Sequence, residues 1–283
     1  MNILILGATG YLGGNIAKKL AGEGHHLYCV IRNVGKIDNL RGIEGIEFIS
    51  NDINQIEMTL KQKSIDWIIN GVCTYKSNDS LYADMIESNI IFPLSVLNLA
   101  IKCGVKNYMT MGTGLPDDFN VYSFTKNKLS DFGRFLSEND GINFLDLKLE
   151  MFYGGNNEPD LRFIKSTKTK LLSNEKVLLT EGTQKRDIVR IEDIVNIVSY
   201  LIRKSLITGY RILPVGTGEQ HSIRDIVSFM KEEIDSKSEL CFGAVENRKG
   251  GEPDTVADIS WLDEIDYKPQ YGFWDGLKEY MNV

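Results

Sequence analysis

The chain has 283 residues, of which 42% are hydrophobic and 25% charged, and its formal net charge is −7 with a sequence pI of about 5.2. This composition is typical of a globular protein with a sizeable core, and the acidic balance argues against a partner that is a nucleic acid or an acidic membrane. No apolar run approaches the ~20 residues of a membrane-spanning helix, and the N-terminus lacks the basic leader of a signal peptide. Four scattered cysteines without a CxxC pair indicate reduced thiols in a cytoplasmic protein.

Short apolar runs alternate with amphipathic segments in the first half of the chain. The pattern predicts strands at 2–6, 26–31, 47–49, 67–69, 108–111 and 143–149, and helices at about 11–20, 82–103 and 122–138, with Pro93 marking a kink or a join in the second helix. Strands that alternate with helices indicate an α/β fold, a Rossmann doubly wound parallel sheet.

The pattern is looser beyond Gly154. A short strand and a helix are predicted over 187–204, a further strand of the main sheet at 211–215, a helix at 222–234, and then a polar, glycine-containing stretch. We expect a dinucleotide-binding domain made of 1–153 and 187–217. A smaller, interwoven C-terminal substrate lobe would comprise 154–186 and 218–283.

A glycine-rich turn joins the first strand to the first helix. GATGYLG places Gly7, Gly10 and Gly13 where a dinucleotide-binding loop needs them: for a tight turn, for close approach to a pyrophosphate, and for close packing of helix on strand. The helix start would present free N–H groups to the diphosphate. The spacing is GxxGxxG, and the strand before it and the helix after it supply the required context.

The end of the second strand selects the cofactor. An acidic residue there would bind the 2′-hydroxyl of NAD, but this chain has Arg32 and Asn33, with Lys36 nearby. An arginine suits a 2′-phosphate. We therefore expect NADP(H) in preference to NAD(H), unless Arg32 is only a solvated surface residue.

Tyr122 and Lys126 lie four residues apart on a predicted helix and so share one face. An ammonium group near a phenol stabilises the phenolate and lowers the tyrosine pKa. Thr113 follows the fifth strand, at the edge where a parallel sheet presents its ligand site. The three histidines are not clustered, so no metal site is predicted.

These motifs resemble the extended short-chain dehydrogenase/reductase family over nearly the whole chain. The glycine loop, Thr113 in YMTMGTG and the YSFTK helix carry the likeness. It extends to NDIN at 51–54, ESN at 87–89, KRDIVRIEDI at 185–194 and RKGGEPDTVADIS at 248–260.

The resemblance implies roles for individual residues. Tyr122 would be the general acid/base, Lys126 would hold the nicotinamide ribose, and Thr113 would hydrogen-bond the reacting oxygen. Arg186 and Arg248 match positions that bind the diphosphate of a nucleotide sugar, the alternative being salt bridges with Asp187 or Glu252. The cofactor-binding residues would be Gly7, Thr9, Gly10, Tyr11, Leu12, Gly13, Arg32, Asp52, Ile53, Cys73, Asn89 and Lys126, and the substrate-binding residues Thr113, Tyr122, Arg186 and Arg248. Members of the family commonly form homodimers, which we also expect here.

Departures from the family pattern narrow the function. Dehydratases of the family carry an Asp-Glu pair after the threonine, whereas Gly114 and Leu115 stand here and cannot transfer protons. The loop from Thr113 to Tyr122 is also short, and Met151 replaces a frequent asparagine. The chain is most similar to bacterial reductases of CDP- or dTDP-linked 4-keto-6-deoxyhexoses of the CDP-abequose synthase type. This implies NADPH-dependent ketone reduction in the synthesis of surface-polysaccharide (O-antigen) sugars. The alternatives are a nucleotide-sugar 4-epimerase with tightly bound NAD and a non-catalytic NADP(H)-sensing protein.

Overall fold

The computed structural model describes residues 1–32, 37–75, 81–205, 208–247 and 251–282. They form two compact units, one of Met1–Lys148 and Val195–Leu213 and the other of Leu149–Ile194 and Pro214–Val283. Each unit is therefore built from two separate stretches of chain. The sequence analysis expected boundaries after residues 153, 186 and 217, whereas these units divide after residues 148, 194 and 213.

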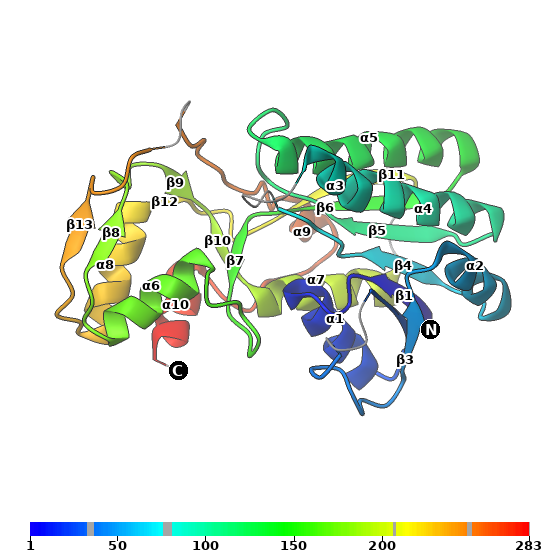
Figure 1. The fold of residues 1–283 in the computed structure, drawn as a ribbon, viewed down its shortest axis with the longest axis horizontal. Coiled ribbons are helices and arrows are strands. Elements are labelled where there is room, and N and C mark those ends of the chain that lie inside the picture. Colours follow the sequence, from blue (N-terminus) through cyan, green and yellow to red (C-terminus); the bar gives the residue numbers. More distant parts are fainter. Residues whose placement is uncertain (33–36, 76–80, 206–207, 248–250, 283) are drawn as a thin grey trace. The chain divides into compact units, whose positions relative to one another are not determined.

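A seven-stranded sheet forms the centre of the first unit (Figure 1). Its strand order is β11-β6-β5-β4-β1-β2-β3, and the pairings from β6 to β3 are all parallel. The predicted parallel α/β sheet is confirmed, including the assignment of 211–215 to it. The strands are β1 (Asn2–Leu6), β2 (His26–Ile31), β3 (Ile46–Ser50), β4 (Trp67–Asn70), β5 (Asn107–Met111), β6 (Asn143–Leu149) and β11 (Tyr210–Val215).

The strand order changes direction between β1 and β4, which are neighbours in the sheet although two strands and two helices separate them in the chain. In open α/β sheets, ligands bind outside the carboxyl ends of the strands at such a switch point. The loops that follow β1 and β4 therefore define where a ligand site is expected.

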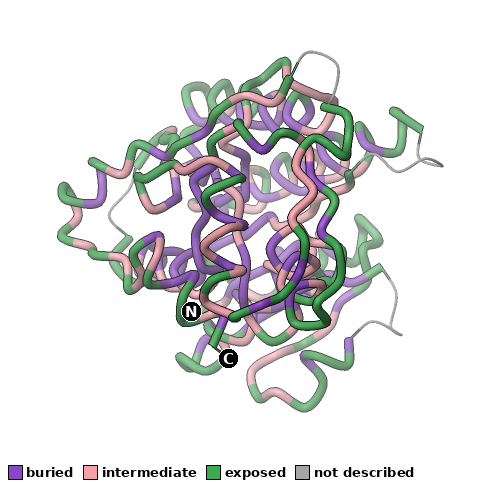
Figure 2. The backbone as a smooth tube through the Cα atoms, turned by 90° about the vertical axis from the view of Figure 1, so that its left-hand side faces the viewer, coloured by how far each residue is buried: buried purple, intermediate pink, exposed green. Residues whose placement is uncertain are grey.

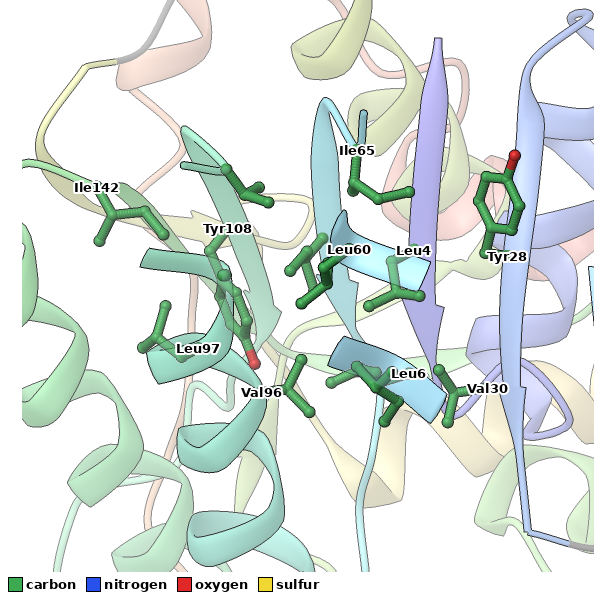
Figure 3. Packing of buried hydrophobic residues seen from close by; sticks show 14 of the residues in the cluster. Leu4, Leu6, Tyr28, Val30, Leu60, Ile65, Val96, Leu97, Tyr108 and Ile142 are labelled. Carbon is green, nitrogen blue, oxygen red and sulfur yellow. The ribbon is translucent and has the colours of Figure 1, made fainter. Parts of the chain in front are cut away.

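Helices cover both faces of the sheet. On one face, α2 (Ile53–Gln62) and α4 (Phe92–Lys102) pack on strand residues such as Leu4 and Tyr108 in a buried cluster (Figure 3). The long helix α5 (Val121–Asp140) lies on the same face, and its Gly133 meets the ring of Phe144 so closely that a side chain there would collide. On the opposite face lie α1 (Tyr11–Gly22) and the part of α7 (Ile191–Lys204) that belongs to this unit (Figure 1).

The helix predicted at 82–103 is interrupted. It consists of α3 (Tyr82–Ile86), a π-helical turn η2 (Glu87–Ile91) and α4, and Pro93 lies in the first turn of α4. Proline cannot donate an N–H bond to the preceding turn, and the wider π turn comes directly before it. The join expected at Pro93 therefore begins a turn earlier.

By length and composition alone, Tyr82–Lys102 could cross a membrane, so the expectation that no segment approaches this limit is wrong. Its residues Val96, Leu97 and Ala100 are instead fully buried in the cluster of Figure 3. A core helix of a globular protein meets the same criterion, because it too presents apolar side chains over most of its surface.

The second unit has its own core. Helices α6 (Phe163–Leu172), α8 (Ile223–Ile234) and α10 (Phe273–Met281) enclose it, and their buried residues recur at helical spacing. Buried and exposed positions alternate in the same way along helical turns of the backbone (Figure 2). Helix α10 corrects the sequence analysis, which expected only a polar stretch there. Short strand pairs complete the unit: β7 (Met151–Tyr153) with β10 (Ile188–Arg190), β9 (Lys185–Arg186) with β12 (His221–Ser222), and β8 (Val177–Leu179) with β13 (Leu240–Phe242); a short helix, α9, spans Trp261–Glu264.

Candidate active site

The glycine loop between β1 and α1 has the geometry that its sequence predicts. Gly7 has a φ of +78°, and a Cβ there would lie 2.9 Å from the backbone of Gly71 in the loop after β4. A Cβ at Gly13 would collide with the carbonyl group of Gly7. Gly10 is the N-cap residue of α1 and its N–H donates to the Gly7 oxygen at 3.0 Å. These close approaches exclude side chains at Gly7 and Gly13 and let the turn and the start of α1 pack closely on the neighbouring backbone.

The other predicted cofactor residues lie at the carboxyl ends of neighbouring strands. Thr9, Tyr11 and Leu12 belong to the glycine loop and the first turn of α1. Arg32 directly follows β2 and is exposed, whereas Asn33 and Lys36 lie outside the described residues. Asp52 is the N-cap of α2, where its carboxylate accepts the N–H groups of Asn54 and Gln55 at 2.9 and 3.2 Å.

Asn89 organises the loop after β4. Its side chain lies in the π turn η2 and is buried. The Asn89 Oδ1 accepts the Thr74 N–H at 2.8 Å, and Nδ2 donates to the Thr74 carbonyl and to the Thr125 hydroxyl, each at 3.0 Å. Asn89 thereby joins the loop that carries Cys73 to helix α5, one residue before Lys126. Its predicted contact with the cofactor stays a prediction.

The three predicted catalytic residues belong to the same unit. Thr113 lies two residues after β5 and is buried, Tyr122 is in the first turn of α5, and Lys126 is one turn further along that helix. The Tyr122 hydroxyl is hydrogen-bonded to the Thr113 side chain. The Lys126 ammonium group donates to the carbonyl oxygen of Val72, in the loop after β4, at 3.2 Å.

The short loop before Tyr122 is locally determined. Residues 116–119 form a turn closed by the Phe119 N–H and the Pro116 carbonyl at 3.2 Å. Asn120 then begins α5 with a capping box, in which its side chain accepts the Ser123 N–H at 2.9 Å and the Ser123 hydroxyl accepts the Asn120 N–H at 3.2 Å. A turn followed at once by a helix cap needs few residues, which explains how eight residues suffice between Thr113 and Tyr122.

Sequence reasoning missed Tyr75. Its ring stacks on that of Tyr122, with ring centroids 4.5 Å apart and an interplanar angle of 29°, and it is 56% exposed. Its position in the loop after β4, at the edge of the sheet where ligands bind, was an available signal.

Burial raises the pKa of the Tyr122 hydroxyl well above that of free tyrosine, and Tyr75 and Cys73 raise it further. A hydrogen bond from Tyr122 to Tyr75 acts in the same direction, whereas the hydrogen bond with Thr113 lowers the pKa. Tyr122 therefore carries its proton at neutral pH. Burial also lowers the pKa of Lys126, while Cys73 and Asp146 raise it and Lys148 lowers it.

Two of the predicted substrate residues, Arg186 and Arg248, belong to the second unit. Arg186 is buried, and its guanidinium forms an ion pair with Glu252 at 2.7 Å and donates to the carbonyl groups of Lys185 and Pro253. The salt bridge with Glu252 that the sequence left open as an alternative is therefore present. Arg248 lies outside the described residues.

Residues 3–216 match the model of the NAD dependent epimerase/dehydratase family, and the chain belongs to this family. The resemblance to extended short-chain dehydrogenase/reductases is thus confirmed, and the site lies in an enzyme of the oxidoreductase type that uses a nicotinamide cofactor.

Among characterised relatives, CDP-abequose synthase of Salmonella typhimurium is 26% identical over 98% of this chain and 96% of its own. The putative UDP-glucose 4-epimerase of Methanocaldococcus jannaschii is 21% identical over 99% and 97%. Among solved structures, the fold matches UDP-glucuronic acid 4-epimerase from Bacillus cereus, determined with UDP-glucuronic acid and NAD, with a TM-score of 0.83, 22% identity and coverage of 100% and 99%. It also matches UDP-glucose 4-epimerase from Thermotoga maritima with a TM-score of 0.84, 21% identity and coverage of 100% and 98%.

Proposed function

We propose that the protein reduces the C4 ketone of a CDP- or dTDP-linked 4-keto-6-deoxyhexose with NADPH. The observation that carries this proposal is that Gly114 and Leu115, whose side chains cannot transfer a proton, follow Thr113, while Tyr122 lies beside Thr113 as a proton donor. Ketone reduction needs one proton donor, whereas elimination of water needs a further acid and base. The full-length similarity to CDP-abequose synthase supports the same reading.

The residues of the chain have distinct roles in this reaction. A bound NADPH would supply the hydride. Tyr122 donates its proton to the C4 oxygen as negative charge develops there, and the Thr113 hydroxyl hydrogen-bonds the same oxygen. The Lys126 ammonium, which contacts the Val72 carbonyl, holds the nicotinamide ribose and stabilises the phenolate that remains on Tyr122.

The glycine loop fits a dinucleotide. Gly7 and Gly13 leave no room for side chains, so the backbone at the start of α1 can approach a diphosphate closely. The exposed Arg32 at the end of β2 suits the 2′-phosphate of NADP(H). Asp52, Ile53, Cys73 and Asn89, in the loops that follow β3 and β4 and in η2, complete the proposed cofactor set.

The test is a Tyr122→Phe variant assayed with NADPH and a CDP- or dTDP-4-keto-6-deoxyhexose. We expect turnover to fall by at least about 100-fold, the scale of general acid catalysis, with cofactor affinity unchanged. Near-normal turnover with intact NADPH binding would refute the role of Tyr122. A chain that only senses NADP(H) would show no turnover in either form.

A 4-epimerase with tightly bound NAD is the second candidate, favoured by the similarity to epimerases in sequence and fold. The exposed Arg32 at the end of β2 weighs against this candidate, because it suits the 2′-phosphate of NADP(H), and a reductant that is consumed is more often NADPH. Net oxidation of NADPH by the 4-keto sugar nucleotide supports the reductase. Isomerisation without net change in the nicotinamide absorbance supports the epimerase.

We place recognition of the sugar nucleotide in the second unit, through Arg186 and Arg248. Arg186 would bind the diphosphate by exchanging part of its ion pair with Glu252 for phosphate oxygens. The product would be a 6-deoxy or dideoxy sugar nucleotide for surface polysaccharide, made in the cytoplasm. None of the four cysteines, which all lie in the described part of the chain, forms a disulfide, and this agrees with a reducing compartment.

We propose that the protein forms a homodimer through α3, η2 and α5. Large apolar side chains are exposed on these elements, which contact one another: Leu81, Tyr82, Ile86, Ile91, Phe124, Phe132 and Phe135. Exposed apolar patches of this kind mark interaction sites. Analytical ultracentrifugation should show a dimer that a Phe132→Glu, Phe135→Glu double variant dissociates. An unchanged sedimentation coefficient in the variant would refute this surface.

A further inference from the structure

Asp146 is a buried acid that the proposed reaction does not use. It lies in β6 of the first unit with its residue 0% exposed, beside the end of β5, where a side chain at Gly112 would collide with its carboxylate. Its partner in the sheet register is Thr110 of β5, whose hydroxyl accepts a hydrogen bond from Asn70 of β4 at 3.1 Å. A strip of polar side chains therefore crosses the carboxyl ends of three strands.

The alternation of side chains along β6 and the helical spacing along α5 place Asp146 on the face of the sheet that α5 covers. Phe144 of β6 meets Gly133 of α5, so the alternate residues Asp146 and Lys148 lie on the same covered face. Lys126 and Ser130 are one turn apart and share one face of α5. The Lys148 ammonium group hydrogen-bonds the side chain of Asn127 in α5, which links the two elements directly.

The charges around Asp146 are specific. The Lys148 ammonium lies 3.4 Å from Asp146 Oδ2, and Lys126 also interacts electrostatically with the carboxylate. Burial raises the pKa of Asp146, while Lys148, Ser130 and Lys126 lower it. The Ser130 hydroxyl is hydrogen-bonded to the Tyr210 hydroxyl of β11 at 2.8 Å, whereas both carboxylate oxygens of Asp146 are buried without a hydrogen-bond partner among the described residues.

We propose that Asp146 is a positioning residue, the counter-ion that keeps the buried Lys126 charged and oriented. Lys126 is only 4% exposed, and an isolated ammonium group in such a place would lose its proton readily. An anion on the β6 side of α5 compensates for the lost hydration. A charged Lys126 is what binding of the nicotinamide ribose and stabilisation of the Tyr122 phenolate require, so the inference rests on the proposed function.

The pH dependence of cofactor binding tests this proposal without any sugar substrate. The groups that face Lys126 are Cys73 in the loop after β4, Asp146 and Lys148 in β6, and Tyr122 on its own helix. The variants are therefore compared in a Tyr122→Phe, Cys73→Ser background, which removes the phenol and the thiol. NADP(H) affinity is measured between pH 6 and 10 by calorimetry.

Two substitutions at neighbouring positions should act in opposite directions. Asp146→Asn removes the anion. The pH at which NADP(H) affinity falls on the alkaline side should then decrease by about one unit, the low end of the effect of a nearby opposite charge. Lys148→Gln removes the cation that repels Lys126, and the pH at which NADP(H) affinity falls should then increase. Shifts in the same direction in both variants, or no shift in either, would overturn the proposal.

If Asp146→Asn does not fold, the Asp146→Asn, Lys148→Gln double variant, which removes both charges together, supplies the comparison. Relative to Lys148→Gln alone, the pH at which its cofactor affinity falls should be lower by about one unit, and no difference would overturn the proposal. A failure of the proposed function would look different. In that case the wild-type protein would not oxidise NADPH with a CDP- or dTDP-linked 4-keto-6-deoxyhexose, whereas the opposite pH shifts of cofactor binding in the two variants would still be observed.

Discussion

Glu150 offers a test of the electrostatics of the second unit. It lies directly before β7, and only 7% of the residue is exposed. Burial raises the pKa of Glu150 from 4.5 to about 7; Asp187 also raises it, whereas a hydrogen bond with Thr255 and the charge of Arg186 lower it. The perturbation is Glu150→Gln, which keeps the shape and the hydrogen-bonding capacity of the side chain and removes its titration.

The magnitude follows from linkage between proton binding and folding. Below pH 4.5 the carboxyl group is protonated in both the folded and the unfolded chain, so its burial carries no ionisation cost. As the pH rises from 4.5 to about 7, the unfolded chain loses the proton before the folded one, and stability is lost. Above pH 7 the loss is complete and amounts to about 3 kcal/mol, at roughly 1.4 kcal/mol for each pH unit between the two pKa values.

The assay is urea unfolding of wild type and Glu150→Gln, followed by circular dichroism at pH 4.5 and pH 8. The free energy of unfolding of the variant, relative to wild type, should rise by about 3 kcal/mol between these two pH values. A difference that is the same at both values would refute the reasoning. It would show that Glu150 ionises in the folded protein as easily as in the unfolded chain.

Three further predictions concern other parts of the structure. Tyr75→Phe removes a hydroxyl that raises the pKa of Tyr122, so the alkaline limb of the pH–rate profile should move to lower pH. An unchanged alkaline limb would contradict an effect of the Tyr75 hydroxyl on Tyr122. Gly133→Ala should destabilise the fold by about 1–3 kcal/mol in urea unfolding because its side chain would collide with an aromatic ring of β6, whereas Gly22→Ala, where 4 Å around the added Cβ is clear of described atoms, should not. Arg186→Met should weaken nucleoside-diphosphate binding by at least ~10-fold, the effect of about 1.4 kcal/mol, and leave NADPH affinity unchanged in calorimetry; unaltered diphosphate affinity would exclude Arg186 from the substrate site.

The first unit could be predicted from the sequence because its signals are local. The spacing of Gly7, Gly10 and Gly13 and the alternation of strands with amphipathic helices each depend on near neighbours in the chain. Helix α10 was missed although Phe273, Leu277 and Met281 recur every four residues, because the glycines at its start and interior suggested a turn.

The arrangement around the catalytic residues was harder to predict. That Thr113, Tyr122 and Lys126 belong together could be inferred from strand ends and helical spacing. The stacking of Tyr75 on Tyr122 and the burial of Asp146 depend on how separate segments pack, and no local pattern records such packing.

A π turn contains one residue more than an α turn, so each position after it is rotated by about 100° relative to an uninterrupted helix. Deleting one residue within Glu87–Ile91 would restore a regular helix over this region. The repaired helix would swing Asn89 away from Thr74 and Thr125 and release the loop from which the Val72 carbonyl meets Lys126. In this segment a regular α-helix and the observed contacts of Asn89 exclude each other, and the extra residue of the π turn is what allows these contacts.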